Sequence, residues 1–76
     1  MSEIRTDLSG RDVRAALERA GFVFQREKGG QMLLRRDKPR TRIVVPDQAI
    51  IRNGTLRRII GDAGLSMDAF NELLEY

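Results

Sequence analysis

The pair Gly29-Gly30 is the feature that most restricts how this chain can fold. It separates two short segments, FVFQRE (22–27) and QMLLRR (31–36), each of which contains three consecutive apolar residues. Adjacent glycines readily adopt the positive φ angles of a tight turn, so the two segments are predicted to pair as an antiparallel β-hairpin. Alternation predicts that one side of the hairpin faces the core and carries Phe22, Phe24, Met32 and Leu34.

The segment before the hairpin is predicted to be a helix. Ser9 and Asp12 have the spacing of a capping box, in which each side chain bonds a backbone amide near the helix start. Gly21 is a candidate for the left-handed residue that follows a helix end. The apolar residues recur at i, i+3, i+4 and i+7, which is typical of one buried helical face. They are Val13, Ala16, Leu17 and Ala20.

Three further elements are predicted after the hairpin. TRIVVP (41–46) is typical of a third strand, and two helices follow, the first capped by Thr55 and ended by Gly64, the second capped by Ser66. The resulting order predicts an α+β two-layer sandwich, α-β-β-β-α with an extra C-terminal helix. We expect a single domain at residues 9–76 after a frayed lead-in at residues 1–8. The inward stripes are Leu56, Ile59, Ile60 and Ala63, then Met67, Phe70, Leu73 and Leu74.

Positive charge is concentrated in the middle of the chain. Residues 26–58 carry ten basic and three acidic side chains, a net charge of +7, while residues 59–76 carry four acidic side chains and no basic one. Arginine, which suits bidentate phosphate contacts, supplies most of this charge. A solvated surface is the alternative, but clustering at the hairpin and at a helix start favours nucleic acid. The candidate RNA-binding residues are Arg26, Lys28, Gly29, Gly30, Arg35, Arg36, Arg52, Thr55, Arg57 and Arg58.

The absent residue types exclude several kinds of site. The chain has no histidine and no cysteine, which removes the usual acid–base group at neutral pH and the usual zinc ligands. We therefore expect no metal and no cofactor. No apolar run approaches the ~20 residues of a membrane span, and no signal peptide opens the chain, so we expect a cytoplasmic protein with no membrane partner.

Three apolar residues are predicted to point away from the core. Val23, Leu33 and Val44 have the opposite strand parity to the core residues and would form a row on the outer face of the sheet. Plain β-propensity is one explanation, and a docking site for a protein partner is the other. Gln31 shares the parity of Leu33, so a partner on this row would also cover Gln31.

Most of the chain resembles the HicA (YcfA-like) toxins of bacterial toxin–antitoxin pairs. The resemblance rests on LSGRDVRAALERAGFVFQREKGGQMLLRR (8–36), IVVPD (43–47) and GTLRRIIGDAGLSMDAF (54–70). It implies a fold like that of double-stranded-RNA-binding domains, an mRNA interferase (endoribonuclease) activity, and a HicB-like antitoxin partner. We expect a monomer alone and a hetero-oligomer with the antitoxin.

The resemblance also implies a catalytic histidine, and this chain lacks it. In the family a histidine in a Gly-Ser-His turn is held to carry catalysis, but here the turn ends in Gln31, and a second family histidine position is Gln48. An amide forms hydrogen bonds but cannot move the protons that RNA cleavage requires. We therefore expect an RNA-cleaving fold that is inactive or impaired, by natural drift or by deliberate replacement of the histidine. The alternatives are a non-catalytic RNA-binding module and a protein-interaction domain that binds only its antitoxin.

Overall fold

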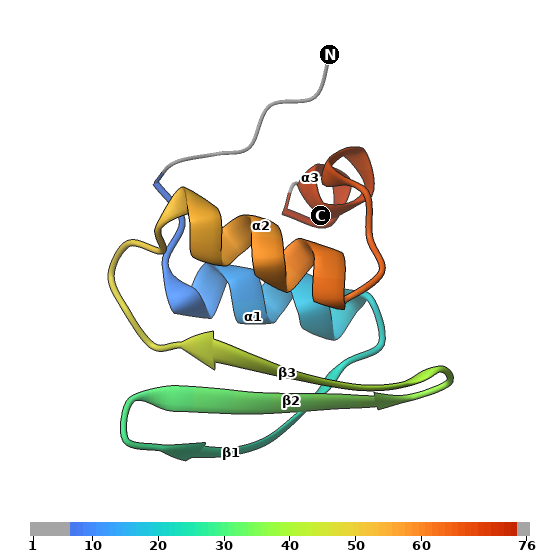
Figure 1. Ribbon diagram of the computed structural model, residues 1–76, viewed down its shortest axis with the longest axis horizontal. Helices are drawn as coiled ribbons and strands as arrows, with labels where there is room; N and C mark the ends of the chain where they lie inside the picture. The colour runs from blue at the N-terminus through green and yellow to red at the C-terminus, as the bar shows by residue number, and fades with distance from the viewer. Residues whose placement is uncertain (1–6, 75–76) are drawn as a thin grey trace.

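The computed structural model describes residues 7–74 and has the predicted order of elements (Figure 1). It confirms an α+β fold with helix, three strands and two helices, the layout of a double-stranded-RNA-binding domain with one extra helix. The elements are α1 (Gly10–Arg19), β1 (Val23–Lys28), β2 (Gln31–Asp37), β3 (Arg40–Pro46), α2 (Asn53–Asp62) and α3 (Met67–Leu74).

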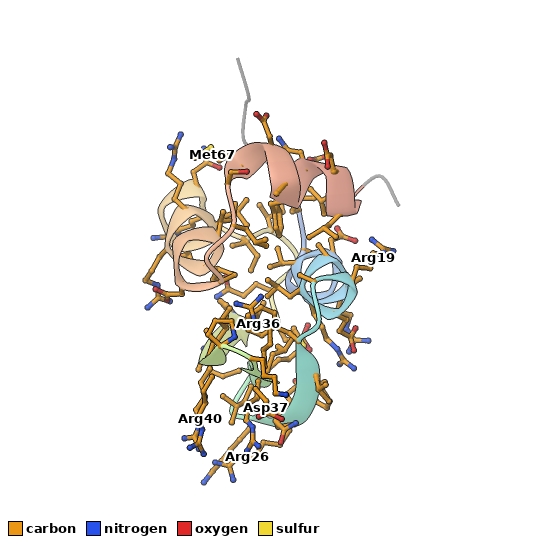
Figure 2. All side chains as sticks on the ribbon, turned by 90° about the vertical axis from the view of Figure 1, so that its right-hand side faces the viewer. Arg19, Arg26, Arg36, Asp37, Arg40 and Met67 are labelled. Atoms are coloured by element: carbon orange, nitrogen blue, oxygen red, sulfur yellow. The ribbon has the colours of Figure 1, made fainter. Side chains whose placement is uncertain are left out.

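The strands form one antiparallel sheet in the order β1-β2-β3, as two consecutive hairpins require. Figures 1 and 2 show α1 and α2 packed on one face of this sheet, with α3 above the helix pair. Within the described chain, no helix covers the other face of the sheet. We call that uncovered side the open face.

The core lies between the sheet and the helices and contains the predicted apolar stripes. Among the described residues, fifteen apolar side chains are buried and no polar or charged residue is. Four predicted core residues, Ala20, Phe24, Leu73 and Leu74, are partly buried and pack against this core. Met67 departs from the prediction, because it is partly buried at the start of α3 and is not among the residues packed against the core. The buried set is Leu8, Val13, Ala16, Leu17, Phe22, Met32, Leu34, Ile43, Val45, Ile51, Leu56, Ile59, Ile60, Ala63 and Phe70.

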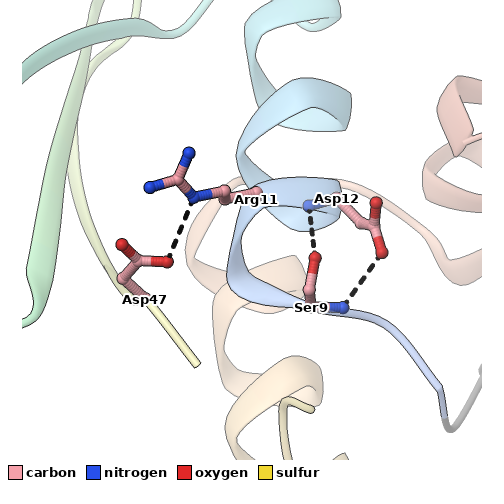
Figure 3. A network of polar contacts seen from close by, with 4 residues as sticks. All are labelled: Ser9, Arg11, Asp12 and Asp47. Carbon is pink, nitrogen blue, oxygen red and sulfur yellow. Dashed lines mark hydrogen bonds and ion pairs between the residues drawn. The ribbon is translucent and has the colours of Figure 1, made fainter. Parts of the chain in front are cut away.

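The first helix begins and ends as its sequence predicts. The backbone N–H of Ser9 donates to Oδ2 of Asp12, and the N–H of Asp12 donates to Oγ of Ser9, both at 3.0 Å (Figure 3). This reciprocal pair satisfies two amides at the helix start. Gly21, with a φ of 96°, takes the left-handed conformation just after the helix.

The start of α2 contradicts the predicted cap. Thr55 lies inside the first turn, while Arg52 occupies the cap position and forms no side-chain capping bond. The helix starts early because tertiary contacts hold the preceding chain. Ile51 is buried, and its N–H donates to the carbonyl of Leu8 at 2.7 Å. Leu8 is itself buried at the end of the predicted lead-in, whose residues 1–6 lie outside the described residues.

Gly10 lies where the helix layer meets the end of the sheet. A Cβ atom at this position would lie 2.0 Å from the carbonyl oxygen of Pro46, the last residue of β3. The N–H of Gly10 donates to the carbonyl of Gln48 at 2.8 Å. Only glycine fits this close approach of two backbones without moving one of them.

We predict that Gly10→Ala lowers the free energy of unfolding by about 1–3 kcal/mol, as expected when extra volume is forced into a packed contact. Urea denaturation followed by circular dichroism measures the change. Gly61→Ala is the matched control: Gly61 is helical, with nothing within 4 Å of its added Cβ, so alanine should stabilise the protein by roughly 0.5–1 kcal/mol. Equal stability of Gly10→Ala and the parent protein would contradict the close-contact argument.

Candidate functional site

Gln31, which the resemblance places at the family histidine position, is the first residue of β2 and lies at the edge of the hairpin turn. It is exposed and pairs with Lys28 on β1 and with Pro46 on β3. Its parity places it on the open face with Leu33. Gln31, Leu33, Arg26, Lys28 and Val44 together line a shallow hollow of about 270 Å³.

The turn before Gln31 is the predicted two-glycine hairpin. Gly29 and Gly30 have φ angles of 59° and 76°, in the region that favours glycine. The carbonyl of Gly30 accepts a hydrogen bond from the N–H of Asp47 at 2.8 Å. This bond joins the turn to the residue that follows β3. The position of Gln31 is therefore fixed by the bond at Gly30 on one side and by its pairing with Pro46 on the other.

The open face is strongly cationic. Strand pairing places five basic side chains on it together with one carboxylate, that of Asp37, a net charge of +4. Figure 2 shows Arg26 and Arg40 projecting from the side of the sheet opposite the helices. The five cations are Arg26, Lys28, Arg35, Arg40 and Arg42.

Arg36 lies on the other side of the sheet from the remaining hairpin cations. Its guanidinium stacks 4.5 Å from the centroid of the Phe22 ring and donates from Nη2 to the carbonyl of Ala63 at 3.1 Å. Figure 2 shows it between the sheet and the helices. Arg36 therefore joins the sheet to the residue that caps the end of α2, and it lies on the opposite side of the sheet from Arg35, its neighbour in sequence.

The start of α2 forms a second basic region, apart from the first. Arg52, Arg57 and Arg58 are exposed on the helix layer, and Thr55 is half-buried in the first turn of α2. Figure 1 places this helix start at the same end of the molecule as the hairpin turn but in the other layer. Apart from Arg36, the predicted RNA-binding residues are thus divided between two surfaces, and those around Gln31 belong to the open face.

The three predicted partner-binding residues point outward but do not form one continuous row. Val23 and Val44 are 59% and 44% exposed, and Leu33 is partly exposed. Leu33 and Val44 are direct cross-strand neighbours, whereas Val23 pairs with Arg35. Charged side chains therefore separate Val23 from an apolar pair that lies next to Gln31.

The three described carboxylates of the basic middle segment are each held in another contact or lie on another side of the sheet. Asp37, at the far end of β2, accepts a hydrogen bond from Nε of Arg35 at 3.0 Å. Asp47 forms an ion pair with Arg11 at 3.5 Å (Figure 3). Glu27 pairs with Met32 and so shares the helix-facing side of the sheet. In the described part of the chain, no group of His, Cys, Asp and Glu could hold a metal ion.

The sequence predictions missed Arg40 and Arg42 as members of the cationic face. The signal was present, because alternation along β3 places both on the same side as Val44. Strand pairing adds the cross-strand neighbours: Arg42 lies directly opposite Arg35, and Arg40 lies opposite Asp37.

Comparison with known families agrees with this architecture. A family model described as the HicA toxin of bacterial toxin–antitoxin systems matches residues 10–65, which include α1, the whole sheet and α2 but not α3. No curated protein gives a significant match to the chain. Within residues 7–74, no helix is both long enough and apolar enough to cross a membrane.

Proposed function

The chain belongs to the HicA toxin family, and from this membership we propose that it is an RNA-binding toxin whose RNA-cleaving activity is lost or strongly impaired. The observation that carries the proposal is Gln31. It occupies the position of the family's catalytic histidine, at the mouth of a cationic hollow suited to an RNA backbone. Messenger RNA as the ligand implies action in the cytoplasm.

The charge of the open face supports RNA binding through phosphates. Its cations are four arginines and a lysine on three neighbouring strands, and these side chains extend away from the core. Contacts of this kind supply affinity without reading sequence. The phenylalanines pack in or against the core, so among residues 7–74 the open face offers no ring for stacking bases. We therefore propose binding that is largely independent of RNA sequence.

The chemistry available at Gln31 supports impaired cleavage. Attack by a 2′-hydroxyl on the adjacent phosphate requires one group to accept that proton and another to protonate the leaving oxygen. The Gln31 amide can orient a phosphate by hydrogen bonding but does neither. Asp37, the one carboxylate on the open face, is bound to Arg35 at the opposite end of β2. A non-catalytic RNA-binding module is the second candidate function, favoured by the same observation.

A HicB-like antitoxin is the proposed protein partner. The partly exposed Leu33 and the exposed Val44 form an apolar pair beside Gln31, and both line the same hollow. A partner packed on this pair would cover Gln31 and block access of RNA. We propose a monomeric toxin that forms a hetero-oligomer with its antitoxin by this occlusion.

RNA binding should weaken steeply as salt is added. With three to five phosphate contacts to a single strand, log K should fall against log salt concentration with a slope of about −2 to −3.5. Fluorescence anisotropy of a labelled oligouridylate across a salt series measures the slope. A flat response, or no binding at low salt, would contradict RNA binding and leave an antitoxin-binding domain.

The unmodified chain should be tolerated on expression and should not cut RNA detectably. Gln31→His, with Gly30→Ser to restore the family turn, should raise the cleavage rate by about 10²–10⁴-fold, the usual contribution of one acid–base group. A gel assay of RNA cleavage and a growth assay measure the two effects. Gln31→Ala is the control and should stay as inactive as the parent. Strong cleavage by the parent chain that survives Gln31→Ala would place catalysis on other residues.

Leu33→Asp should abolish the antitoxin complex without unfolding the toxin. Leu33 points away from the core, so a carboxylate there removes an apolar contact with the partner at little cost to the fold. Co-purification with the antitoxin and thermal unfolding of the toxin alone give the two readouts. Val23→Asp is the comparison and should have the smaller effect, since Val23 lies among charged residues away from Gln31. Unimpaired binding by Leu33→Asp would place the antitoxin on another surface.

A further inference from the structure

Strand β1 contains a bulge that changes which of its side chains reach the open face. Phe24 pairs with β2, and the next paired residue is Arg26, so Gln25 is the extra residue of a β-bulge. With regular alternation from Phe24, Arg26 would point toward the helices and Glu27 toward the open face. The bulge reverses this. It brings a guanidinium to the open face and removes a carboxylate from it.

This reversal completes a cluster of three arginines contributed by three strands. Arg35 and Arg42 are direct cross-strand partners, and Arg26 lies on the other side of β2, opposite Leu33. The three arginines line a hollow of about 280 Å³ that has no carboxylate in its lining. By contrast, the larger hollow at the end of the sheet near Lys38 does include a carboxylate, that of Asp37.

The cluster carries more positive charge than its neighbours neutralise. Like charges opposite each other on adjacent strands destabilise a sheet. Arg35 donates from Nε to Asp37, but within the described residues no ion pair joins Arg26 or Arg42 to a carboxylate. An anion bound in the hollow would relieve this repulsion.

The arginine hollow lies next to the hollow at Gln31. Arg26 and Leu33 line both of them, so the two hollows follow one another along β2 from Gln31 to Arg35, and we call the pair the groove. Four strand residues correspond to about 13 Å. A ligand that fills this groove must be an extended chain that carries several anionic groups. A single phosphate ion is too short to do so.

We propose that Arg26, Arg35 and Arg42 form a binding site for the backbone phosphates of single-stranded RNA, and that the strand continues along the groove to Gln31. The identity of the ligand rests on the proposed function. Guanidinium groups suit phosphate oxygens because they donate two parallel hydrogen bonds. The three groups converge on one concave hollow, which suits a single flexible backbone better than a rigid duplex with its phosphates in two separated rows.

The test compares two variants that each lose two positive charges. Arg26→Gln with Arg42→Gln alters the groove, and Arg57→Gln with Arg58→Gln alters the exposed face of α2. Both are titrated by fluorescence anisotropy with a labelled oligouridylate of about 12 nucleotides over a salt series. The groove variant should bind more weakly, with a salt slope smaller in magnitude by about 1.4, the value for two lost contacts to a single strand. The α2 variant removes two of the predicted RNA-binding arginines outside the groove and should lose less of the parent slope than the groove variant does. The groove variant should unfold at the same or a higher temperature.

Each other outcome has a separate meaning. If the salt slope falls in the α2 variant and is unchanged in the groove variant, the arginine site is overturned. RNA binding, and with it the proposed function, would then still hold. Absence of oligouridylate binding by the parent chain overturns both. A duplex RNA of equal length that binds as tightly, with the same slope loss in the groove variant, overturns the single-strand assignment. If the groove variant binds RNA as the parent chain does but no longer binds poly-glutamate, the cluster is a site for an acidic protein and the proposal is overturned.

Discussion

The contact between Gly10 and Pro46 is the constraint on which the arrangement of this small domain depends. It brings the start of α1 against the end of β3, at a separation that leaves no room for a side chain. Backbone hydrogen bonds reinforce the junction, from Gly10 to Gln48 and from Asp47 to Gly30. Because Pro46 pairs with Gln31, the same junction fixes the position of that candidate site residue. The same junction between α1 and β3 therefore stabilises the fold and positions the candidate site.

One face of the sheet is cationic and the other packs on the apolar core. Residues that are adjacent in sequence point to different faces. Arg35 joins the cationic open face, while Arg36 packs on Phe22 and bonds the end of α2. On β1 the bulge at Gln25 makes a comparable separation, sending Arg26 outward and Glu27 toward the helix side. The net charge of the chain is only +3, yet this sorting collects a net charge of +4 on one face of the sheet. RNA affinity in this account comes from placement of charge more than from its total.

Much of the fold could be predicted because its signals are local. The Ser9–Asp12 capping box, the two-glycine turn and the apolar helical stripes each act within a few residues, and the structure has all of them. The start of α2 could not be predicted in this way, because the buried Ile51 and its bond to Leu8 replace a side-chain cap. In the candidate site, too, some features follow from local sequence and others depend on contacts between distant residues. Parity alone placed Gln31, Leu33 and Val44 outward, and it also puts Arg36 on the side of Met32 and Leu34. The bulge at Gln25 could not be predicted in this way, because it appears only in the pairing of β1 with β2.

The central claim is that RNA lies on the open face of the sheet, against Gln31. Its most direct test is a nuclear magnetic resonance titration of the isotopically labelled chain with an oligouridylate, followed at the side-chain amide of Gln31 and at the backbone amides. The account predicts saturable shifts for Gln31 and along β2, with α1 and α3 unchanged. Shifts confined to the start of α2, with the Gln31 amide unmoved, would contradict it.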